Sequence, residues 1–255
     1  MILTIDIGNS IVTLGCVAGE EIRFRGRVNS DRVKTSDQYC IELKTLLEIY
    51  GIALEELEGC IISSVVPQVL NSMRTAVEKL LGKGPLIVGP GLKTGVNILL
   101  DSPAQLGADL LVADVAALRE HKPPLIVIDM GTATTMSVLD KDGAHLGGCV
   151  CPGVQISVDA LTRNTSLLPG IRLDQPQKAI GRNTTDAMRS GIMMGTASML
   201  DGMIDRFEEE LGARCKVILT GGLGRFIQPL CRHEIIYDRD LIIKGLAHLY
   251  RDNAL

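Results

Sequence analysis

Tryptophan is absent from this sequence, and the other aromatic residues are few. Three phenylalanines and four tyrosines make up 3% of the 255 residues, whereas hydrophobic residues together make up 46%. The core must therefore be built from Leu, Ile, Val, Met and Ala. Because the bases of single-stranded nucleic acids stack on aromatic side chains, this composition argues against a protein that binds such strands.

Long runs of one charge, or of apolar residues, are also missing. With 26 basic and 30 acidic residues the formal net charge is −4, and no clustered basic face for nucleic acid is visible. No apolar run approaches the ~20 residues that cross a bilayer. Asp6 stands where a signal peptide would stay apolar. We therefore expect a cytoplasmic protein without nucleic-acid or membrane partners.

The seven cysteines form no Cys-x-x-Cys pair. Most lie in apolar runs, and the only close pair, Cys149 and Cys151, has no neighbouring histidine and would make a poor zinc site. The four histidines are scattered along the chain. These patterns predict free thiols in a reducing compartment and no histidine-based metal site.

One pattern occurs twice in the chain. A β-branched stretch ends in Asp6-Ile7-Gly8, and another ends in Asp129-Met130-Gly131, with an offset of 123 residues for both Asp and Gly. A second apolar stretch and a hairpin turn follow each copy. A duplication at half the chain length predicts two similar α/β lobes. The polar, proline-containing stretch 119–124 separates them, so we expect lobes over residues 1–118 and 119–255.

Strands and helices alternate in the rest of the chain. Buried apolar runs predict strands over residues 59–65, 85–88 and 216–220, and helical periodicity predicts helices over 39–49, 71–81, 185–211 and 240–253. In the third of these helices Gly191, Gly195 and Gly202 form a row of small residues. Such a row predicts close packing of another backbone, either across a dimer interface or within the chain.

Each Asp-x-Gly turn suits a phosphate group. A glycine just after a strand lets the backbone fold tightly and direct its N–H groups at phosphate oxygens. The preceding carboxylate can hold a cation, and the hydroxyls of Ser10 and Thr132 can donate to phosphate. One such turn is a weak signal. Two matched turns, with a strand that ends at Gly221-Gly222, predict a nucleotide between two lobes.

Six longer motifs follow one another along the chain: Asp6–Ser10, Gly107–Asp109, Asp129–Thr135, Leu146–Gly153, Ile180–Thr184 and Thr220–Gly222. Together they resemble the type III pantothenate kinases, in the same order from Met1 to about Asn253. The resemblance implies two duplicated actin-like, ribonuclease-H-like α/β lobes with a nucleotide cleft between them, as in the acetate-kinase, sugar-kinase, Hsp70 and actin superfamily. It implies ATP-dependent phosphorylation of pantothenate to 4′-phosphopantothenate, the first step of coenzyme A biosynthesis. It also implies Mg²⁺, a monovalent cation (K⁺ or ammonium) and a homodimer.

The resemblance further implies roles for individual residues. Asp6 would lie near magnesium, Asp129 would hold the monovalent cation, and Asp109 would take the proton of the substrate hydroxyl. Thr184 would contact pantothenate from the neighbouring subunit, and Gly221-Gly222 would border the adenosine. The implied substrate-binding residues are Gly107, Ala108, Asp109, Leu110 and Thr184. The implied ATP-binding residues are Asp6, Ile7, Gly8, Asn9, Ser10, Ile11, Val12, Thr13 and Thr132.

Asp109 also has an ordinary interpretation. If a helix begins at Gly107, this acid lies in its first turn, where the helix dipole stabilises a carboxylate. First-turn acids are common in helices without any catalytic role. A carboxylate stabilised in this way would be a weak base, which phosphoryl transfer tolerates because it depends mainly on alignment and charge neutralisation.

Two positions depart from the family pattern, both on the acceptor side. Leu110 stands where the family usually has an arginine, and Leu100 where it usually has a tyrosine. Loss of a charged hydrogen-bond partner costs about 2–5 kcal/mol of binding. Two alternatives therefore stay open beside pantothenate phosphorylation. One is a related kinase with a changed acceptor, and the other is a catalytically silent ATP-binding regulator.

Overall fold

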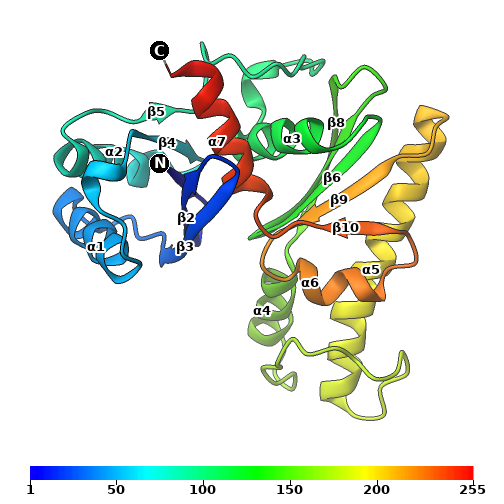
Figure 1. The fold of residues 1–255 in the computed structure, drawn as a ribbon. Coiled ribbons are helices and arrows are strands. Elements are labelled where there is room, and N and C mark those ends of the chain that lie inside the picture. Colours follow the sequence, from blue (N-terminus) through cyan, green and yellow to red (C-terminus); the bar gives the residue numbers. More distant parts are fainter. Residues whose placement is uncertain (255) are drawn as a thin grey trace. The chain divides into compact units, whose positions relative to one another are not determined.

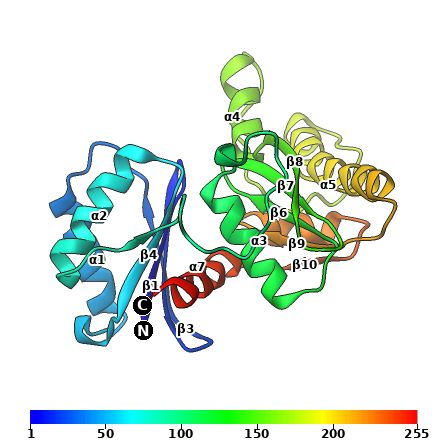
Figure 2. The ribbon, with the colours of Figure 1, turned by 90° about the horizontal axis from the view of Figure 1, so that it is seen from above.

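The computed structural model describes residues 1–254, which form two compact units (Figures 1 and 2). The first contains Met1–Val96, Ser102–Ala116 and the residues from Asp240 onward. The second contains Asn97–Asp101 and Ala117–Arg239. Each unit is built on one mixed five-stranded sheet.

The first unit has the strand order β3-β2-β1-β4-β5. Strands β1, β2 and β3 are antiparallel neighbours, and β4 and β5 run parallel to β1. The strands are β1 (Ile2–Ile7), β2 (Ile11–Ala18), β3 (Glu21–Asn29), β4 (Gly59–Ser64) and β5 (Leu86–Ile87). The helices are α1 (Ser36–Ile49), η1 (Leu54–Glu56), α2 (Pro67–Leu81), η2 (Pro103–Gln105) and α7 (Leu241–Asn253). Helix α3 (Ala108–Glu120) begins in this unit, and its residues from Ala117 onward belong to the second.

Helices cover both faces of this sheet (Figure 2). On one face, Leu3, Ile5 and Ile7 of β1 join a buried core with apolar side chains of α1 and α2. On the other face α7 packs closely, because a Cβ at Gly15 would lie 2.7 Å from the Ile243 side chain. Burial on both faces explains why β1 is apolar at almost every position until Asp6 at its carboxyl end.

The second unit repeats this topology with every strand number raised by five, in the order β8-β7-β6-β9-β10. The duplication expected from the Asp-x-Gly pattern is therefore confirmed. The strands are β6 (Leu125–Met130), β7 (Ala133–Leu139), β8 (His145–Pro152), β9 (Lys216–Thr220) and β10 (Ile235–Tyr237). The helices are α4 (Val154–Asn164), α5 (Thr184–Leu211), α6 (Gly224–Ile227) and η3 (Gln228–Leu230).

The compact units do not follow the expected division into residues 1–118 and 119–255. Helix α7 belongs to the first unit, where it packs against β1, β2 and β4. Its buried apolar face includes Leu241, Leu246 and Leu249. A Cβ at Gly245 would overlap the backbone of Val112, so α7 also crosses α3 closely. The apolar face of α7, and not its place in the sequence, therefore determines the unit in which it packs.

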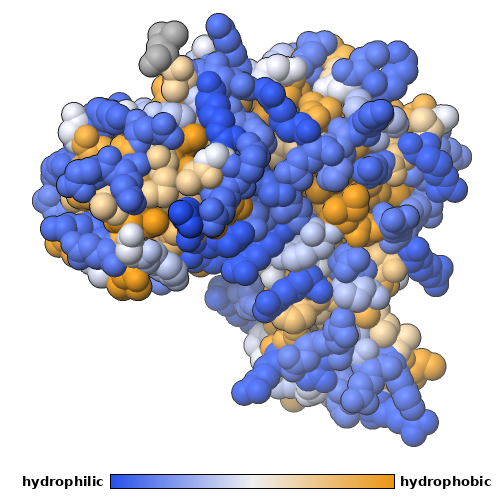
Figure 3. All heavy atoms as spheres, viewed as in Figure 1, coloured by the Kyte–Doolittle hydropathy of each residue, from blue (hydrophilic) through white to orange (hydrophobic). Residues whose placement is uncertain are grey.

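The row of small residues on α5 is not packed within the chain. A Cβ at Gly191, Gly195 or Gly202 would meet no atom within 4 Å in the described part of the structure. No other segment of the described second unit packs closely on this row, and the dimer interface stays a prediction. Figure 3 shows a mostly hydrophilic surface with separated hydrophobic patches. No helix of residues 1–254 combines the length and the apolar character needed to cross a membrane.

Candidate active site

The first Asp-x-Gly turn joins β1 to β2. The Gly8 N–H donates to the Ile11 carbonyl at 3.0 Å, and a Cβ at Gly8 would lie 3.1 Å from that same oxygen. The turn is thus tight enough to favour glycine. Asn9 and Ser10 are exposed at its tip, where their backbone can face a ligand.

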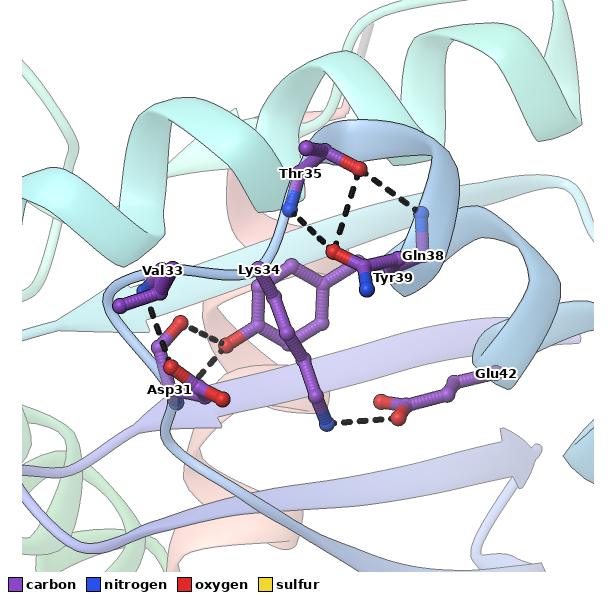
Figure 4. A network of polar contacts seen from close by, with 7 residues as sticks. All are labelled: Asp31, Val33, Lys34, Thr35, Gln38, Tyr39 and Glu42. Carbon is purple, nitrogen blue, oxygen red and sulfur yellow. Dashed lines mark hydrogen bonds and ion pairs between the residues drawn. The ribbon is translucent and has the colours of Figure 1, made fainter.

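A loop after β3 anchors this turn, because the Ser30 N–H donates to the Ser10 carbonyl at 3.0 Å. Figure 4 shows how α1 holds the next residues. The buried Tyr39 hydroxyl accepts from the Asp31 N–H at 3.0 Å and donates to the Asp31 carbonyl at 2.8 Å. Lys34 lies over the Tyr39 ring and pairs with Glu42 at 2.6 Å. The position of the turn therefore depends on the packing of α1.

Sequence reasoning did not predict this anchor. Its only local signal is the capping box of Thr35 and Gln38, which fixes the start of α1. The contact of Tyr39 with Asp31 arises only when the loop folds back over the helix, and no periodicity encodes that.

The second turn joins β6 to β7 and is one residue shorter. The Gly131 N–H donates to the Ala133 carbonyl at 3.0 Å. Two further glycines pack their backbones against it: a Cβ at Gly153 would overlap the Thr132 carbonyl, and one at Gly221 would overlap the backbone of Met130. Gly221 also has a φ of 98°, which L-residues with side chains rarely adopt. The second turn is therefore packed against the backbones of Gly153 and Gly221 within the second unit.

Asp109 lies in the first turn of α3, as expected. Its Oδ1 accepts from the Leu110 N–H at 2.9 Å. A Cβ at Gly107 would lie 2.5 Å from that Oδ1, so glycine leaves space for the carboxylate to turn back over the helix start.

The expectation that Asp109 is a weak base is corrected by its burial. Desolvation raises the pKa of this carboxyl above its ordinary value and outweighs the backbone N–H groups of Leu110 and of Asp109 itself, which lower it. The sequence predicts the first-turn position, but the desolvation comes from tertiary packing. Asp109 is therefore a better proton acceptor than an exposed aspartate.

The residues that depart from the family pattern lie in different units. Leu110 follows Asp109 in α3, in the first unit. Leu100 belongs to a segment that pairs with His145 of β8 through the Leu99 N–H, at 2.9 Å from the His145 carbonyl. Its side chain would lie 3.6 Å from a Cβ at Gly147. Both leucines are partly buried.

Thr184 is the first residue of α5 and is exposed. The preceding Asn183 caps the helix by accepting from the Asp186 N–H at 2.9 Å. A Cβ at Gly181 would overlap the backbone of Ala187, so the preceding loop lies directly on the helix. Thr184 is therefore held at a well-anchored helix start.

Asp205, Glu208 and His233 gather near the end of α5, where one ligand atom from each lies within 4.8 Å of the others. Their polar atoms already have partners in the protein. Glu208 accepts from Arg214 at 2.6 Å and from the Cys215 N–H at 2.8 Å, and His233 contacts Asp205 at 2.9 Å. We therefore assign this cluster to fixing the helix end against the following loops.

Taken together, the first unit carries the Asp6–Thr13 turn and the Gly107–Leu110 segment, and the second carries Asp129, Thr132 and Thr184. Both units have the same topology, and each carries one Asp-x-Gly turn after its first strand.

Solved structures with this fold cover nearly the whole chain. A Baf family protein from Campylobacter jejuni is 19% identical, with a TM-score of 0.64 and 98% of each chain covered. A protein assigned as a 2-dehydro-3-deoxygalactonokinase from Sinorhizobium meliloti is 13% identical, with a TM-score of 0.59 and 98% of each chain covered. Component A of the (R)-2-hydroxyglutaryl-CoA dehydratase of Acidaminococcus fermentans is 14% identical, with a TM-score of 0.56 and coverage of 98% of this chain and 96% of that one.

The family model described as type III pantothenate kinase matches residues 2–206. Because this match covers well over half of the chain, the protein belongs to the type III pantothenate kinase family. Its activity is accordingly that of an ATP-dependent kinase of coenzyme A biosynthesis.

Proposed function

We propose that Asp109 is the proton acceptor when this kinase transfers the γ-phosphoryl group of ATP to the 4′-hydroxyl of pantothenate. The observation that carries the proposal is the partly buried Asp109 carboxylate, held at Oδ1 by the Leu110 N–H. With Oδ1 fixed, the second carboxylate oxygen can accept the hydroxyl proton. The raised pKa of Asp109 improves it as a base.

The Asp6–Thr13 turn and Thr132 bind the ATP phosphates in this proposal. Support for their fit to phosphate comes from the tight turn at Gly8, which leaves Asn9 and Ser10 exposed, and from Gly153 and Gly221, whose backbones pack against the second turn. Asp6 offers the carboxylate oxygens that Mg²⁺ prefers, and Asp129 offers the same to K⁺ or ammonium. When bound, Mg²⁺ neutralises charge on the phosphates during transfer.

The test is ADP release from Mg-ATP with and without pantothenate, for the wild type and Asp109→Asn, with K⁺, ammonium or sodium as the only monovalent cation. Asn has the same shape and can still accept from the Leu110 N–H. We expect turnover to fall by roughly 10²–10⁴-fold, while affinity for ATP stays within a factor of two or so. Turnover that is unchanged in Asp109→Asn would remove Asp109 from the mechanism.

A changed acceptor is the second candidate, and the observation that favours it is the pair of aliphatic side chains at Leu110 and Leu100. If pantothenate is the acceptor but binds weakly, Leu110→Arg should lower its KM by roughly tenfold or more, because arginine supplies a charge-assisted hydrogen bond. Leu110→Met, which has a long side chain but no charge, is the matched control. If neither variant lowers the KM for pantothenate and ADP release requires another hydroxyl compound, the acceptor has changed. ATP binding without any turnover would instead indicate a silent regulator.

We also propose a cytoplasmic homodimer in which Thr184 contacts pantothenate bound to the other subunit. Support comes from the open row of Gly191, Gly195 and Gly202 on α5, the helix that Thr184 begins. Leu167 and Ile180, in the loop before α5, are 90% and 82% exposed, and apolar side chains gathered near one helix favour a protein partner. The free thiols fit a reducing compartment.

A further inference from the structure

Each of the two Asp-x-Gly acids lies between hydroxyl residues of the neighbouring strands. Asp6 is in register with Thr13 of β2 and Ser63 of β4. Asp129 is in register with Thr135 of β7 and Thr220 of β9. Residues in register point to the same face, and neighbouring strands lie only ~4.8 Å apart. The duplication therefore repeats a row of hydroxyl, carboxylate and hydroxyl in both units.

One hydroxyl in each row has no hydrogen-bond partner. Ser63 is completely buried, and its Oγ lacks a partner within residues 1–254. The buried Oγ1 of Thr135 is in the same situation in the described part of the second unit. A buried hydroxyl without a partner costs about 1–3 kcal/mol, and folded proteins rarely leave one in place without a reason.

Nearby hydroxyls of the first sheet do have partners. Thr4 lies two residues before Asp6 on the same face of β1 and donates to the Gly15 carbonyl at 3.2 Å. Ser64, next to Ser63, contacts Val66 through both its donor and its acceptor, at 3.2 and 3.0 Å, and so shapes the turn into α2. In the first sheet the missing partner is therefore found beside Asp6 and not at Thr4 or Ser64. In the second sheet, as far as the structure describes it, the buried Thr134 next to Thr135 also lacks a partner.

We propose that Ser63 and Thr135 are positioning residues for the two acids. Ser63 orients the Asp6 carboxylate and the water shell of its Mg²⁺, and Thr135 does the same for Asp129 and its monovalent cation. A hydroxyl can donate to a carboxylate or to a metal-bound water, and its oxygen can also accept. Hydrogen bonds of this kind fix the orientation of a ligating side chain and strengthen metal binding. This inference rests on the proposed function, because it assumes that ATP and its cations bind at these turns.

The decisive experiment compares Ser63→Ala with Thr4→Val, two buried hydroxyls on one face of one sheet. Affinity for ATP is measured by calorimetry with Mg²⁺ and with EDTA, without any acceptor, and the melting temperature is measured without ligand. Ser63→Ala should lose roughly tenfold in Mg²⁺-dependent affinity. Its melting temperature should stay the same or rise, because an unsatisfied hydroxyl is removed. Thr4→Val should show the reverse, a lower melting temperature with unchanged affinity.

Two further variants extend the test. Ser63→Cys keeps a weak donor of similar size, so its affinity should lie between those of the wild type and Ser63→Ala. Thr135→Val should raise the K⁺ concentration that gives half-maximal ATP binding, again by roughly tenfold, whereas Ser63→Ala should leave that K⁺ dependence unchanged.

The results separate this inference from the proposed function. If wild-type protein does not bind Mg-ATP at all, both fail. If the wild type binds Mg-ATP but Ser63→Ala binds it equally well, or only loses stability, the positioning role is overturned while the proposed function stands.

Discussion

At the scale of single residues, Asp109 combines two opposing effects. Its place in the first turn of α3 and the Leu110 N–H favour the charged carboxylate, whereas burial disfavours it. Burial is the larger effect, so ionising this carboxyl costs stability in the folded protein. Such a cost is typical of active sites, where function is favoured over stability.

The raised pKa of Asp109 determines how its contribution to stability depends on pH. Because the pKa of Asp109 is higher in the folded state than in the unfolded chain, stability from this residue falls as pH rises from the ordinary aspartate value, about 4, to the raised value. Asp109→Asn should therefore melt at a higher temperature than the wild type at pH 7, and the advantage should shrink toward pH 4. Thermal melts of both proteins across this range measure it.

The pH dependence of turnover should report the same raised pKa of Asp109. Catalysis requires the ionised carboxylate, so the acid limb of the rate profile should lie above the ordinary aspartate range. An Asp109→Asn protein that is less stable than the wild type at every pH would contradict the view that burial of the charged carboxylate costs stability.

At the scale of elements, the Asp6–Ser10 turn is held by the packing of α1 through the loop after β3. Tyr39→Phe keeps the buried ring but leaves the N–H and carbonyl of Asp31 without the hydroxyl. We expect a loss of about 1–3 kcal/mol in the free energy of unfolding and weaker ATP binding, because Ser30 then holds the Ser10 carbonyl less firmly.

The matched control is Tyr50→Phe at the other end of α1. The Tyr50 ring is half exposed and packs at a tilt against Phe24, with ring centroids 4.5 Å apart, and this contact does not need the hydroxyl. Denaturant unfolding and ATP calorimetry on both variants measure the difference. Equal effects of the two substitutions would contradict the anchoring role.

Helices and strands could be predicted from the sequence where their signals lie in neighbouring residues. The repeated Asp-x-Gly pattern predicts both central strands and their turns, because strand propensity and glycine both act locally. The strand expected over 85–88 is reduced to Leu86–Ile87, and the three-residue β10 was not predicted at all. Short edge strands carry too few residues for a periodic pattern. The raised pKa of Asp109 and the unsatisfied hydroxyl of Ser63 depend on neighbours distant in sequence, so no local pattern could predict them.

At the scale of the whole molecule, the proposed dimer can be tested on α5. A Cβ at Gly195 would meet nothing in the described chain, so Gly195→Leu should leave the melting temperature of the subunit nearly unchanged. If α5 forms the dimer interface, the bulky side chain should prevent close approach of a second copy and give monomers in light scattering. Gly195→Ala is the milder control. A Gly195→Leu protein that remains dimeric would show that α5 lies outside the interface.

Helix α7 is the last helix of the described chain, but it packs in the first unit, against β1, β2 and β4. During synthesis on the ribosome, the first sheet therefore emerges long before the helix that covers one of its faces. The second unit has all of its strands by Tyr237, so it can complete its sheet first. The unit that is translated first is thus the one that finishes folding last. Until α7 arrives, one face of the first sheet stays uncovered in the nascent chain, and incomplete folding of this kind favours aggregation.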